Sequence, residues 1–459
     1  MDAGATGTAP TIAETLADWI TAASPIPPSC EAMAGRLLLD VAGLCVAARG
    51  ETYVQAVLGS AEPGGTCTAI GQARGFGAYD AALVNGTAAH GEDFDDTFEG
   101  GPVHSGAVVV PAVLAACERE GLGGAALLRG IVVGAEMMCR LSLVAPKAIH
   151  KAGFHPTAVI GTMAAAGGVA AALSLSRADT VAAIGIAGSM ASGIIEYLAE
   201  GTWTKRAHAG LAAQNGIRAA LMARGGFLGP RTVFEGTHGF FKAFAPSREP
   251  DFAPVLRGLG EDWLMGTIAF KPFPCGTMTQ PYIDCAIALA NEGIDPEVVE
   301  SILCEVGEGT VHRLWEPLAA KHRPATSYAA KFSTPFCIAV GLLDRAAGFG
   351  QFTEARVHDP AVQRLAAKVR YSIDPANPYP ANFTGHLRAT LQDGTVREVR
   401  QDHMRGGVHA PLSTAEVEAK FRANALYGGW TEAQADAMAR ALAGLFKATD
   451  MAALAAGRE

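Results

Sequence analysis

The stretch AGFHPTAVIGTMAAAGGVAAALSLS, residues 152–176, carries no formally charged side chain and consists largely of Ala, Gly and Thr. A helix that crosses a membrane would instead be rich in Leu, Ile and Phe. Small residues at helical spacing allow neighbouring helices to approach closely. The stretch therefore predicts a buried helix, opened by His155 and Pro156, within a large helical core.

Helical periodicity continues on both sides of this stretch, over the first 265 residues. Apolar residues recur at the 3.6-residue spacing of a helix, and Gly and Pro separate the segments. The predicted helices cover residues 11–23, 30–48, 107–119, 125–144, 157–175, 178–199 and 207–224. We therefore expect a helical domain rich in Ala and Gly.

The pattern changes near residue 267. Residues 267–270 are β-like, and side-chain types alternate at 301–306 and 368–373, which predicts three short strands. Asp393-Gly394 predicts a two-residue hairpin between two more. Helices are expected at 281–290 and 328–347. Residues 269–408 are thus predicted to form an α+β unit.

Helical character then returns in the C-terminal tail. Ser413-x-x-Glu416 and Thr431-x-x-Gln434 are capping-box patterns, which mark helix starts. Because the tail resembles the first part of the chain, we expect a mainly α fold. Its large all-helical domain would comprise residues 1–268 plus 409–459, and a smaller α+β domain, 269–408, would be inserted into it.

Composition limits the class of protein. Of 459 residues, 49% are hydrophobic and 18% are charged, so the chain can bury a large core. The net charge of −9 and the lack of a Lys/Arg run argue against a nucleic acid or an anionic membrane as partner. Nine scattered cysteines without a CxxC pair predict reduced core residues in a cytoplasmic protein. The N-terminus carries acids where a secretory signal needs positive charge.

The segment NGTAAHGEDFDDTFEGGPVHSG, residues 85–106, concentrates ionisable side chains. If residues 91–98 are helical or turn-like, Asp93 and Thr97 share a face, and His104 follows a Gly-Gly-Pro turn. Three interpretations are open. The acids could form a solvated helix start, where the helix dipole favours negative charge. They could instead bind magnesium or manganese. In the third interpretation, Asp93, Thr97 and His104 converge as a general acid/base site.

Further candidates come from other segments. His155 precedes a helix, where its imidazole would lie at the positive end, although a structural histidine fits equally well. Lys205 lies near a helix start, an unfavourable place for a cation, which suggests an anionic partner, although a solvated lysine fits too. Arg206 follows it. Lys271 lies at the predicted domain junction, and clefts between domains are preferred ligand sites.

Two motifs of other enzyme classes are not supported. GLGGAA, from residue 121, matches a dinucleotide-binding spelling but follows a helix instead of a strand, so it is predicted to be a loop. Neither Ser nor Cys lies in a nucleophile-elbow sequence. We therefore expect no nucleotide cofactor.

Six blocks of the chain form a more specific pattern: HGEDFDDT, VHSGAVVVPAVLAACE, GFHPTAVIGTMAAA, TKRAHAGLAAQNGIRA, GFLGPRTVFEGTHGFFKAF and FKPFPCGTMTQPYIDCA. In order and approximate spacing they resemble the MmgE/PrpD family, over most of residues 85–285. The resemblance implies an all-helical domain, a smaller α+β lid domain, a homodimer, and no metal or organic cofactor. It makes the metal interpretation of the acidic segment a minor one.

The resemblance also implies chemistry. Family members act on small carboxylates as dehydratases, decarboxylases or epimerases, 2-methylcitrate dehydratase among them. Carried over by position, the implied catalytic set is Asp93, Thr97, His104, His155 and Lys205. Arg206, Lys271 and Gln280 are expected to bind substrate.

Two positions depart from the family pattern. The decarboxylase branch has a histidine at the place of Gly276, and many other members have one at the place of Gln280. The loss of these titratable groups argues against decarboxylation.

We therefore expect a cofactor-independent lyase of the dehydratase type, acting on a small di- or tricarboxylate of the 2-methylcitrate or citrate kind. The histidines would move protons, and Lys205 would stabilise the negative charge that grows as a carbon next to a carboxylate is deprotonated. An epimerase of a small dicarboxylate would use the same groups. A catalytically inactive member that only binds a ligand is a further alternative.

Overall fold

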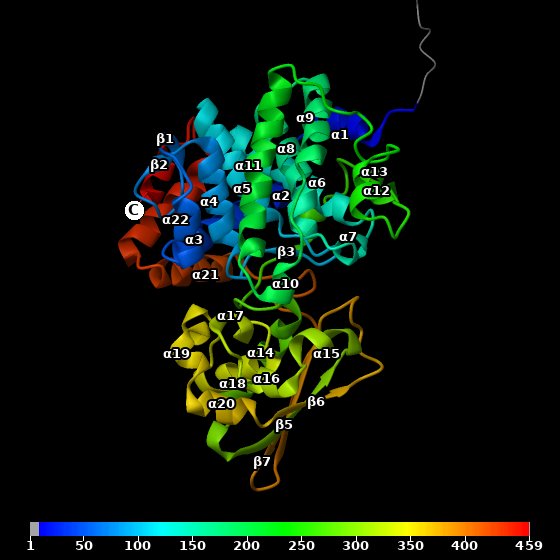
Figure 1. Ribbon diagram of the computed structural model, residues 1–459. Coiled ribbons are helices and arrows are strands. Elements are labelled where there is room, and N and C mark those ends of the chain that lie inside the picture. Colours follow the sequence, from blue (N-terminus) through cyan, green and yellow to red (C-terminus); the bar gives the residue numbers. More distant parts are fainter. Residues whose placement is uncertain (1–8, 459) are drawn as a thin grey trace, which may run out of the picture. The chain divides into compact units, whose positions relative to one another are not determined.

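The computed structural model describes residues 9–458 and is mainly helical, with a small mixed sheet in the C-terminal region (Figure 1). The start of the N-terminal sequence, which predicts that no secretory signal is present, lies outside the described residues. Contacts divide the chain into two compact units. The helical unit comprises residues 9–91, 96–268 and 421–458, and the sheet unit comprises residues 92–95 and 269–420.

The helical unit is built around α8 (Pro156–Ala172), in which every residue from Thr157 to Ala172 is buried. This confirms the buried helix of small residues. It packs against α5, α6, α9 and α11. Glycines allow the approach: a Cβ on Gly168 would lie 2.7 Å from the carbonyl oxygen of Gly130 in α6, closer than real contacts permit.

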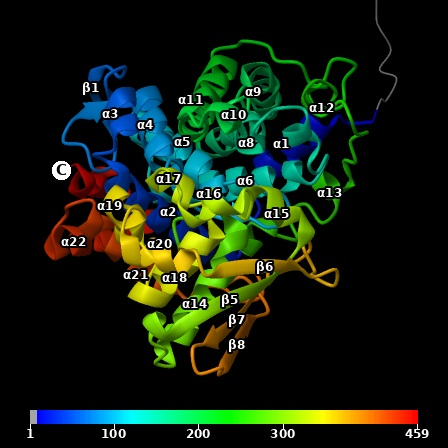
Figure 2. The same ribbon diagram turned by 60° about the horizontal axis from the view of Figure 1, so that its bottom comes forward.

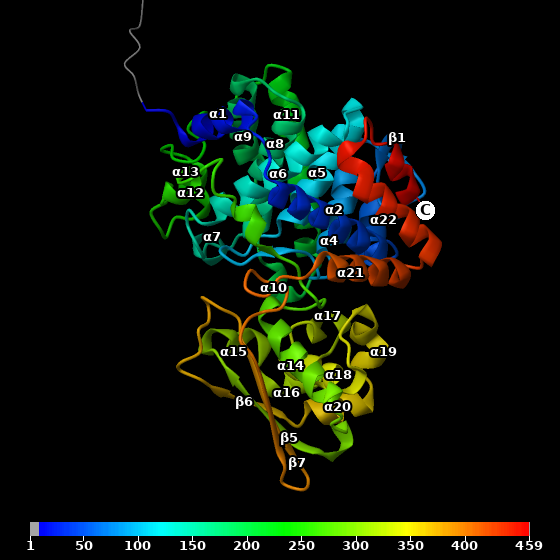
Figure 3. The same cartoon turned by 180° about the vertical axis from the view of Figure 1, so that it is seen from behind.

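A second close approach joins α4 to α11. A Cβ on Gly86 would lie 2.6 Å from the Cα of Gly210, and a Cβ on Gly210 would lie 2.2 Å from the carbonyl oxygen of Leu83. The view from behind shows α2 running beside α4, α5 and α6 (Figure 3). The helices of this unit are α1 (Ile12–Ala22), α2 (Pro28–Ala48), α3 (Thr52–Leu58), α4 (Ala78–His90), α5 (Ser105–Glu120), α6 (Gly124–Ser142), α7 (Ala148–Lys151), α8, α9 (Arg177–Met190), α10 (Tyr197–Glu200), α11 (Thr204–Arg224), α12 (Phe240–Phe244), α13 (Ala253–Leu256), η1 (Leu264–Thr267), α22 (Glu432–Gly444), η5 (Leu445–Lys447), η6 (Ala452–Gly457) and the second half of α21 (Thr414–Tyr427).

The structure corrects the sequence prediction at several positions within this unit. The predicted helix at 178–199 is interrupted after Met190, because Ala191 is extended and Gly193 has a φ of 129°. Helix α4 and the shorter helices α3, α7, α12 and α13 were not predicted. The first 265 residues are also not wholly helical, since β1 (Pro63–Thr68) pairs with β2 (Gly75–Phe76) and β3 spans Thr97–Phe98.

The sheet unit contains four strands in the order β6-β5-β7-β8 (Figure 2). β5 (Val299–Val306) is parallel to β6 (Val369–Ile373) and antiparallel to β7 (Gly385–Leu391), which pairs with β8 (Val396–Gln401). A hairpin forms at the predicted place, but its loop has three residues, 392–394, and not two. The backbone N–H of Leu391 donates to the carbonyl oxygen of Thr395 at 2.8 Å, Gly394 has a φ of 83°, and the backbone N–H of Thr395 donates to the Asp393 side chain.

Helices α14 and α18 pack on each other, and α14 packs on β7. Together with the sheet they enclose the apolar core of this unit. The predicted helix at 328–347 is in fact two, because Ser333 caps a new helix after α17. The remaining elements are β4 (Ile268–Ala269), η2 (Thr277–Thr279), α14 (Gln280–Asn291), η3 (Pro296–Val298), α15 (Glu308–Leu314), α16 (Leu318–His322), α17 (Ser327–Ala330), α18 (Thr334–Asp344), η4 (Phe349–Phe352), α19 (Glu354–Val357) and α20 (Pro360–Ala366).

Other sequence expectations can also be compared with the structure. Both capping boxes are confirmed by reciprocal hydrogen bonds, at Ser413 with Glu416 and at Thr431 with Gln434. All nine cysteines are buried and unpaired. In the described part of the chain, no helix combines the length and apolarity that crossing a bilayer requires.

Candidate active site

His155 is fixed at the N-terminus of α8 by its backbone. Pro156 is the first helical residue, a position that suits its fixed φ. The backbone N–H of His155 donates to the carbonyl oxygen of Gly193 at 2.9 Å. The break between α9 and α10 therefore brings Gly193 beside His155, whose side chain is buried.

Three further histidines surround this imidazole. His90 is the last residue of α4, His104 is the N-cap of α5, and His208 lies in α11. The ring centroid of His90 is 5.0 Å from that of His104 and 5.5 Å from that of His155. We call His90, His104, His155 and His208 the histidine cluster. It brings residues more than one hundred positions apart into one site.

His155 and His208 form the closest pair of the cluster. Their Nδ1 atoms lie 3.2 Å apart, which is hydrogen-bond distance. The ring of Tyr197 meets both imidazoles edge-on, at centroid distances of 6.4 Å and 5.8 Å. Because neither Nδ1 can donate and accept at once, one ring must carry the proton and the other the lone pair.

Burial keeps both of these imidazoles neutral. It lowers the pKa of His155 well below 6.5, and the nearby charges of His90, Lys205, His208 and His104 lower it further. Burial also lowers the pKa of His208 to about 4, with His90 and Lys205 contributing. At pH 7 both rings are therefore in the form that can accept a proton.

The tautomer of His104 follows from its hydrogen bond. Its Nδ1 lies 2.6 Å from the carbonyl oxygen of Asp96, which can only accept. Nδ1 therefore carries the proton, and in the neutral ring Nε2 has the lone pair. The Asp96 carboxylate accepts the backbone N–H of Gly106 at 2.9 Å, in the first turn of α5. Asp96 thus fixes the position of His104 and caps its helix.

The other predicted site residues of the helical unit are placed as follows. Lys205 is half-buried at the start of α11, close enough to His155 and His208 to lower the pKa of both. Arg206 lies with its guanidinium carbon 4.3 Å from the ring centroid of Tyr53, a cation–π contact. Thr97 is buried in β3. Lys205 is thus the predicted cation that lies beside the histidine cluster.

A pocket of about 550 Å³ opens beside the cluster. Its lining includes Gly193, Glu196, Tyr197 and Glu200, from the segment between α9 and α11, and His208 from α11 itself. His208 therefore contacts both the pocket and the buried His155.

In the sheet unit, Asp93 is held by two other side chains. Its carboxylate accepts the hydroxyl of Tyr328 at 2.8 Å, and its carbonyl oxygen accepts the ammonium group of Lys271 at 3.0 Å. Lys271 is buried and also lies 3.8 Å from a carboxylate oxygen of Asp95. Lys271, predicted to bind substrate, is thus engaged with the acidic segment.

The acidic segment is turn-like and not helical. Asp93 has a φ of 55°, and Thr97 already belongs to β3, so the helical spacing that would place them on one face does not apply. The ammonium group of Lys331 pairs with the Glu92 carboxylate, and that of Lys420 donates to the carbonyl oxygen of Phe94 at 2.6 Å. Lysines from distant positions therefore fix residues 92–95 within the sheet unit.

Gln280 has a structural role. Its side chain is wholly buried, its oxygen accepts the backbone N–H of Phe273, and its nitrogen donates to the carbonyl oxygens of Phe273 and Cys275. These bonds brace the turn after Lys271. Gln280, predicted to bind substrate, is thus engaged with the backbone of this turn.

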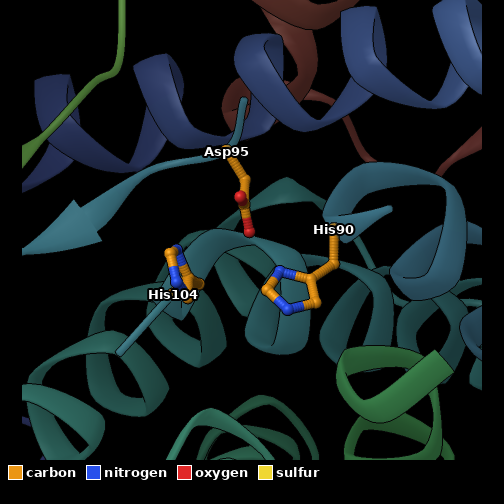
Figure 4. Close-up of side chains that lie close together, drawn as sticks. All are labelled: His90, Asp95 and His104. Carbon is orange, nitrogen blue, oxygen red and sulfur yellow. The ribbon is translucent and has the colours of Figure 1, made fainter. Parts of the chain in front are cut away.

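Imidazole nitrogens are also good metal ligands, and His90 and His104 lie side by side (Figure 4). Catalytic zinc sites usually have three protein ligands. Within the described residues of the helical unit, no third His, Cys, Asp or Glu completes a group with these two, since Asp95, also drawn in Figure 4, belongs to the sheet unit.

Comparison with protein families identifies the chain. Residues 14–253 match the model of the MmgE/PrpD N-terminal domain, and residues 273–443 match that of the MmgE/PrpD C-terminal domain. The chain belongs to the MmgE/PrpD family. This confirms the resemblance carried by the six sequence blocks.

Curated members of the MmgE/PrpD family are similar along most of this chain. A cis-aconitate decarboxylase of Aspergillus terreus is 31% identical over 437 residues, which cover 87% of this chain and 86% of the relative. The cis-aconitate decarboxylases of Mus musculus and Homo sapiens are 33% and 32% identical, over 75% of this chain and 71% and 72% of their own lengths. These relatives are lyases that act on a tricarboxylate.

Three residues that contact predicted site residues were given no role by the sequence. His90 and His208 lie inside two of the six blocks, HGEDFDDT and TKRAHAG, but nothing in their spacing shows that they meet His155. Tyr328 lies more than two hundred residues from Asp93, so only the fold reveals their hydrogen bond.

Proposed function

We propose that this protein is a cofactor-independent lyase of the dehydratase type, acting on a small tricarboxylate of the citrate or 2-methylcitrate kind. The observation that carries the proposal is the histidine cluster, in which His90, His155 and His208 are buried, with Lys205 beside it. Elimination of water from such a substrate needs a base for a carbon-bound proton and an acid for the leaving hydroxyl. The two neutral imidazoles of His155 and His208, next to one cation, contribute to these functions without an organic cofactor.

In the proposed mechanism His155 removes the proton from the carbon next to a carboxylate. Its lowered pKa keeps it unprotonated at neutral pH, so it can accept the proton. Negative charge then grows on the substrate, and the ammonium group of Lys205 stabilises it. His104 accepts or donates at Nε2, since its Nδ1 is bound to Asp96.

Asp93 and Thr97 are proposed to protonate and bind the leaving hydroxyl. The hydroxyl of Tyr328 holds the Asp93 carboxylate in one orientation, as a catalytic carboxylate requires. The guanidinium group of Arg206 lies over the ring of Tyr53, and its positive charge is proposed to attract the anionic substrate. Lys271 is proposed to position Asp93 instead of contacting the substrate.

Decarboxylation is the second candidate, because the curated relatives at 31–33% identity are cis-aconitate decarboxylases. Gly276 offers no titratable group where that branch has histidine, which favours water elimination. Epimerisation of a small dicarboxylate, through removal and return of one proton, is the third. All three reactions begin at a carbon next to a carboxylate.

The products separate these candidates. EDTA-treated protein is incubated with citrate, 2-methylcitrate, cis-aconitate and smaller 2-hydroxy acids, and ultraviolet absorbance and carbon dioxide are measured. The proposal predicts an unsaturated product with all carbons retained. Carbon dioxide release from cis-aconitate would establish the decarboxylase instead, and deuterium exchange from heavy water without elimination would establish the epimerase.

Three further expectations accompany this proposal. We propose a homodimer located in the cytoplasm, with the α+β unit acting as a lid. Light scattering measures the mass, which is predicted to be twice the 47.3 kDa of one chain. A mass of one chain at micromolar concentration would contradict the dimer.

A further inference from the structure

The contact between His155 and His208 constrains where a proton can reside. Their Nδ1 atoms are 3.2 Å apart, and both rings are buried, so the contact is stabilising only if one of these nitrogens is protonated and the other is not. Two neutral arrangements satisfy this condition. In one His155 donates, and in the other His208 donates.

The two rings differ in their surroundings. His208 forms part of the lining of the 550 Å³ pocket, together with Glu196, Glu200 and Tyr197, whereas His155 is not part of that lining. His155 instead stacks on His90, with an angle of 24° between the rings. His208 lines the pocket and its Nδ1 lies 3.2 Å from that of His155, so it can carry a proton between that ring and the pocket.

We propose that His155 and His208 act as a dyad that shares one proton along the Nδ1–Nδ1 line. His208 is the positioning residue: it sets the tautomer of His155 and passes a proton between that buried ring and the pocket. The assignment of His155 as the proton acceptor rests on the proposed function. The shared proton itself rests only on geometry.

Before the proton transfer, His155 has its proton on Nδ1 and its lone pair on Nε2. The substrate C–H bond breaks, its electron pair stays on carbon, and Nε2 of His155 takes the proton. The Nδ1–H bond of His155 then breaks as an Nδ1–H bond forms on His208. The positive charge moves to His208, which lines the pocket together with Glu196 and Glu200, and the charges of His90 and Lys205 oppose it.

Nitrogen NMR of the full-length protein, with 15N in its histidine rings, tests the dyad without substrate. Signals are assigned with His155→Gln and His208→Gln. At pH 7 we expect one ring of the pair to carry its proton on Nδ1 and the other on Nε2, and loss of either ring to change the tautomer of its partner. Two rings that both have an unprotonated Nδ1 would overturn the proposal, and the wild-type spectrum alone can show this.

Kinetics provide the second test. His208→Gln can still form a hydrogen bond but cannot accept a proton, so kcat is expected to fall about ten- to a hundredfold with KM nearly unchanged. His238→Gln, at an exposed position, is the matched control and is expected to keep full activity. Unchanged kcat in His208→Gln would overturn the relay. A protein with the expected tautomers but no turnover of any carboxylate would overturn the proposed function and leave the dyad intact.

Discussion

The Nδ1 atom of His104 lies 2.6 Å from the carbonyl oxygen of Asp96, so the acidic segment sets the tautomer of a histidine in the cluster. The same aspartate caps α5 through its carboxylate. Each of the four acids in residues 92–96 has a partner: Asp96 the start of α5, Glu92 Lys331, Asp93 Tyr328 and Asp95 Lys271.

Asp96→Asn is expected to reduce stability more than activity. The buried carboxylate accepts the Gly106 N–H at the start of α5, where a negative charge is favoured by the helix dipole. The amide oxygen of asparagine can still accept this N–H, so the loss of the negative charge is expected to cost about 0.3–2 kcal/mol of unfolding free energy. Urea unfolding measures this difference. An unchanged unfolding midpoint would contradict the capping role.

Asp93→Asn is expected to do the reverse. The amide oxygen can still accept the Tyr328 hydroxyl, so the fold is retained, but the group can no longer transfer a proton. We expect kcat to fall about 10²- to 10⁴-fold. Tyr328→Phe is the matched control, because it keeps the carboxylate and removes only its orienting bond, and a smaller loss is expected. Full activity in Asp93→Asn would exclude the acid role.

Stability is expected to depend on pH through His208. The unfolded pKa is near 6.5 and the folded pKa is about 4, so between these values only the unfolded state binds the proton. The stabilisation that comes from unprotonated His208 is therefore complete above pH 6.5. As the pH falls toward 4 it is lost, which lowers the free energy of unfolding by roughly 3 kcal/mol. Wild type should lose more stability than His208→Gln over this range. Parallel pH profiles of the two proteins would contradict this.

Gly210→Ala is expected to disturb the site through packing. Its Cβ would lie 2.2 Å from the carbonyl oxygen of Leu83, so α4 and α11, which carry His90 and His208, must separate. We expect a loss of about 1–3 kcal/mol and lower kcat. Gly444→Ala, with no atom within 4 Å of its Cβ, is the control and is expected to be nearly neutral. Equal stability of both variants would refute the close approach.

Local patterns predicted much of the fold. The helices at 30–48, 107–119 and 157–175 and the hairpin at Asp393-Gly394 follow from periodicity and turn chemistry, and the structure confirms them. The break after Met190 was not predicted. It depends on Gly193 reaching the backbone of His155, a contact between residues 38 positions apart.

The site was less predictable than the fold. The sequence blocks pointed to His104, His155 and Lys205, and the structure places these residues near one another. It could not show that His208 and Tyr328 contact predicted site residues, since long-range contacts decide this. The roles assigned to Asp93 and Thr97, and to the sheet unit as a lid, stay predictions.

The most direct test of the account is proton NMR of EDTA-treated wild type and His155→Gln with citrate and 2-methylcitrate in heavy water. The account predicts that wild type converts one of them to an unsaturated tricarboxylate, and that the folded variant is about 10²- to 10⁴-fold slower. Water elimination at the wild-type rate by His155→Gln, or turnover that is abolished by EDTA and restored by a metal ion, would contradict it.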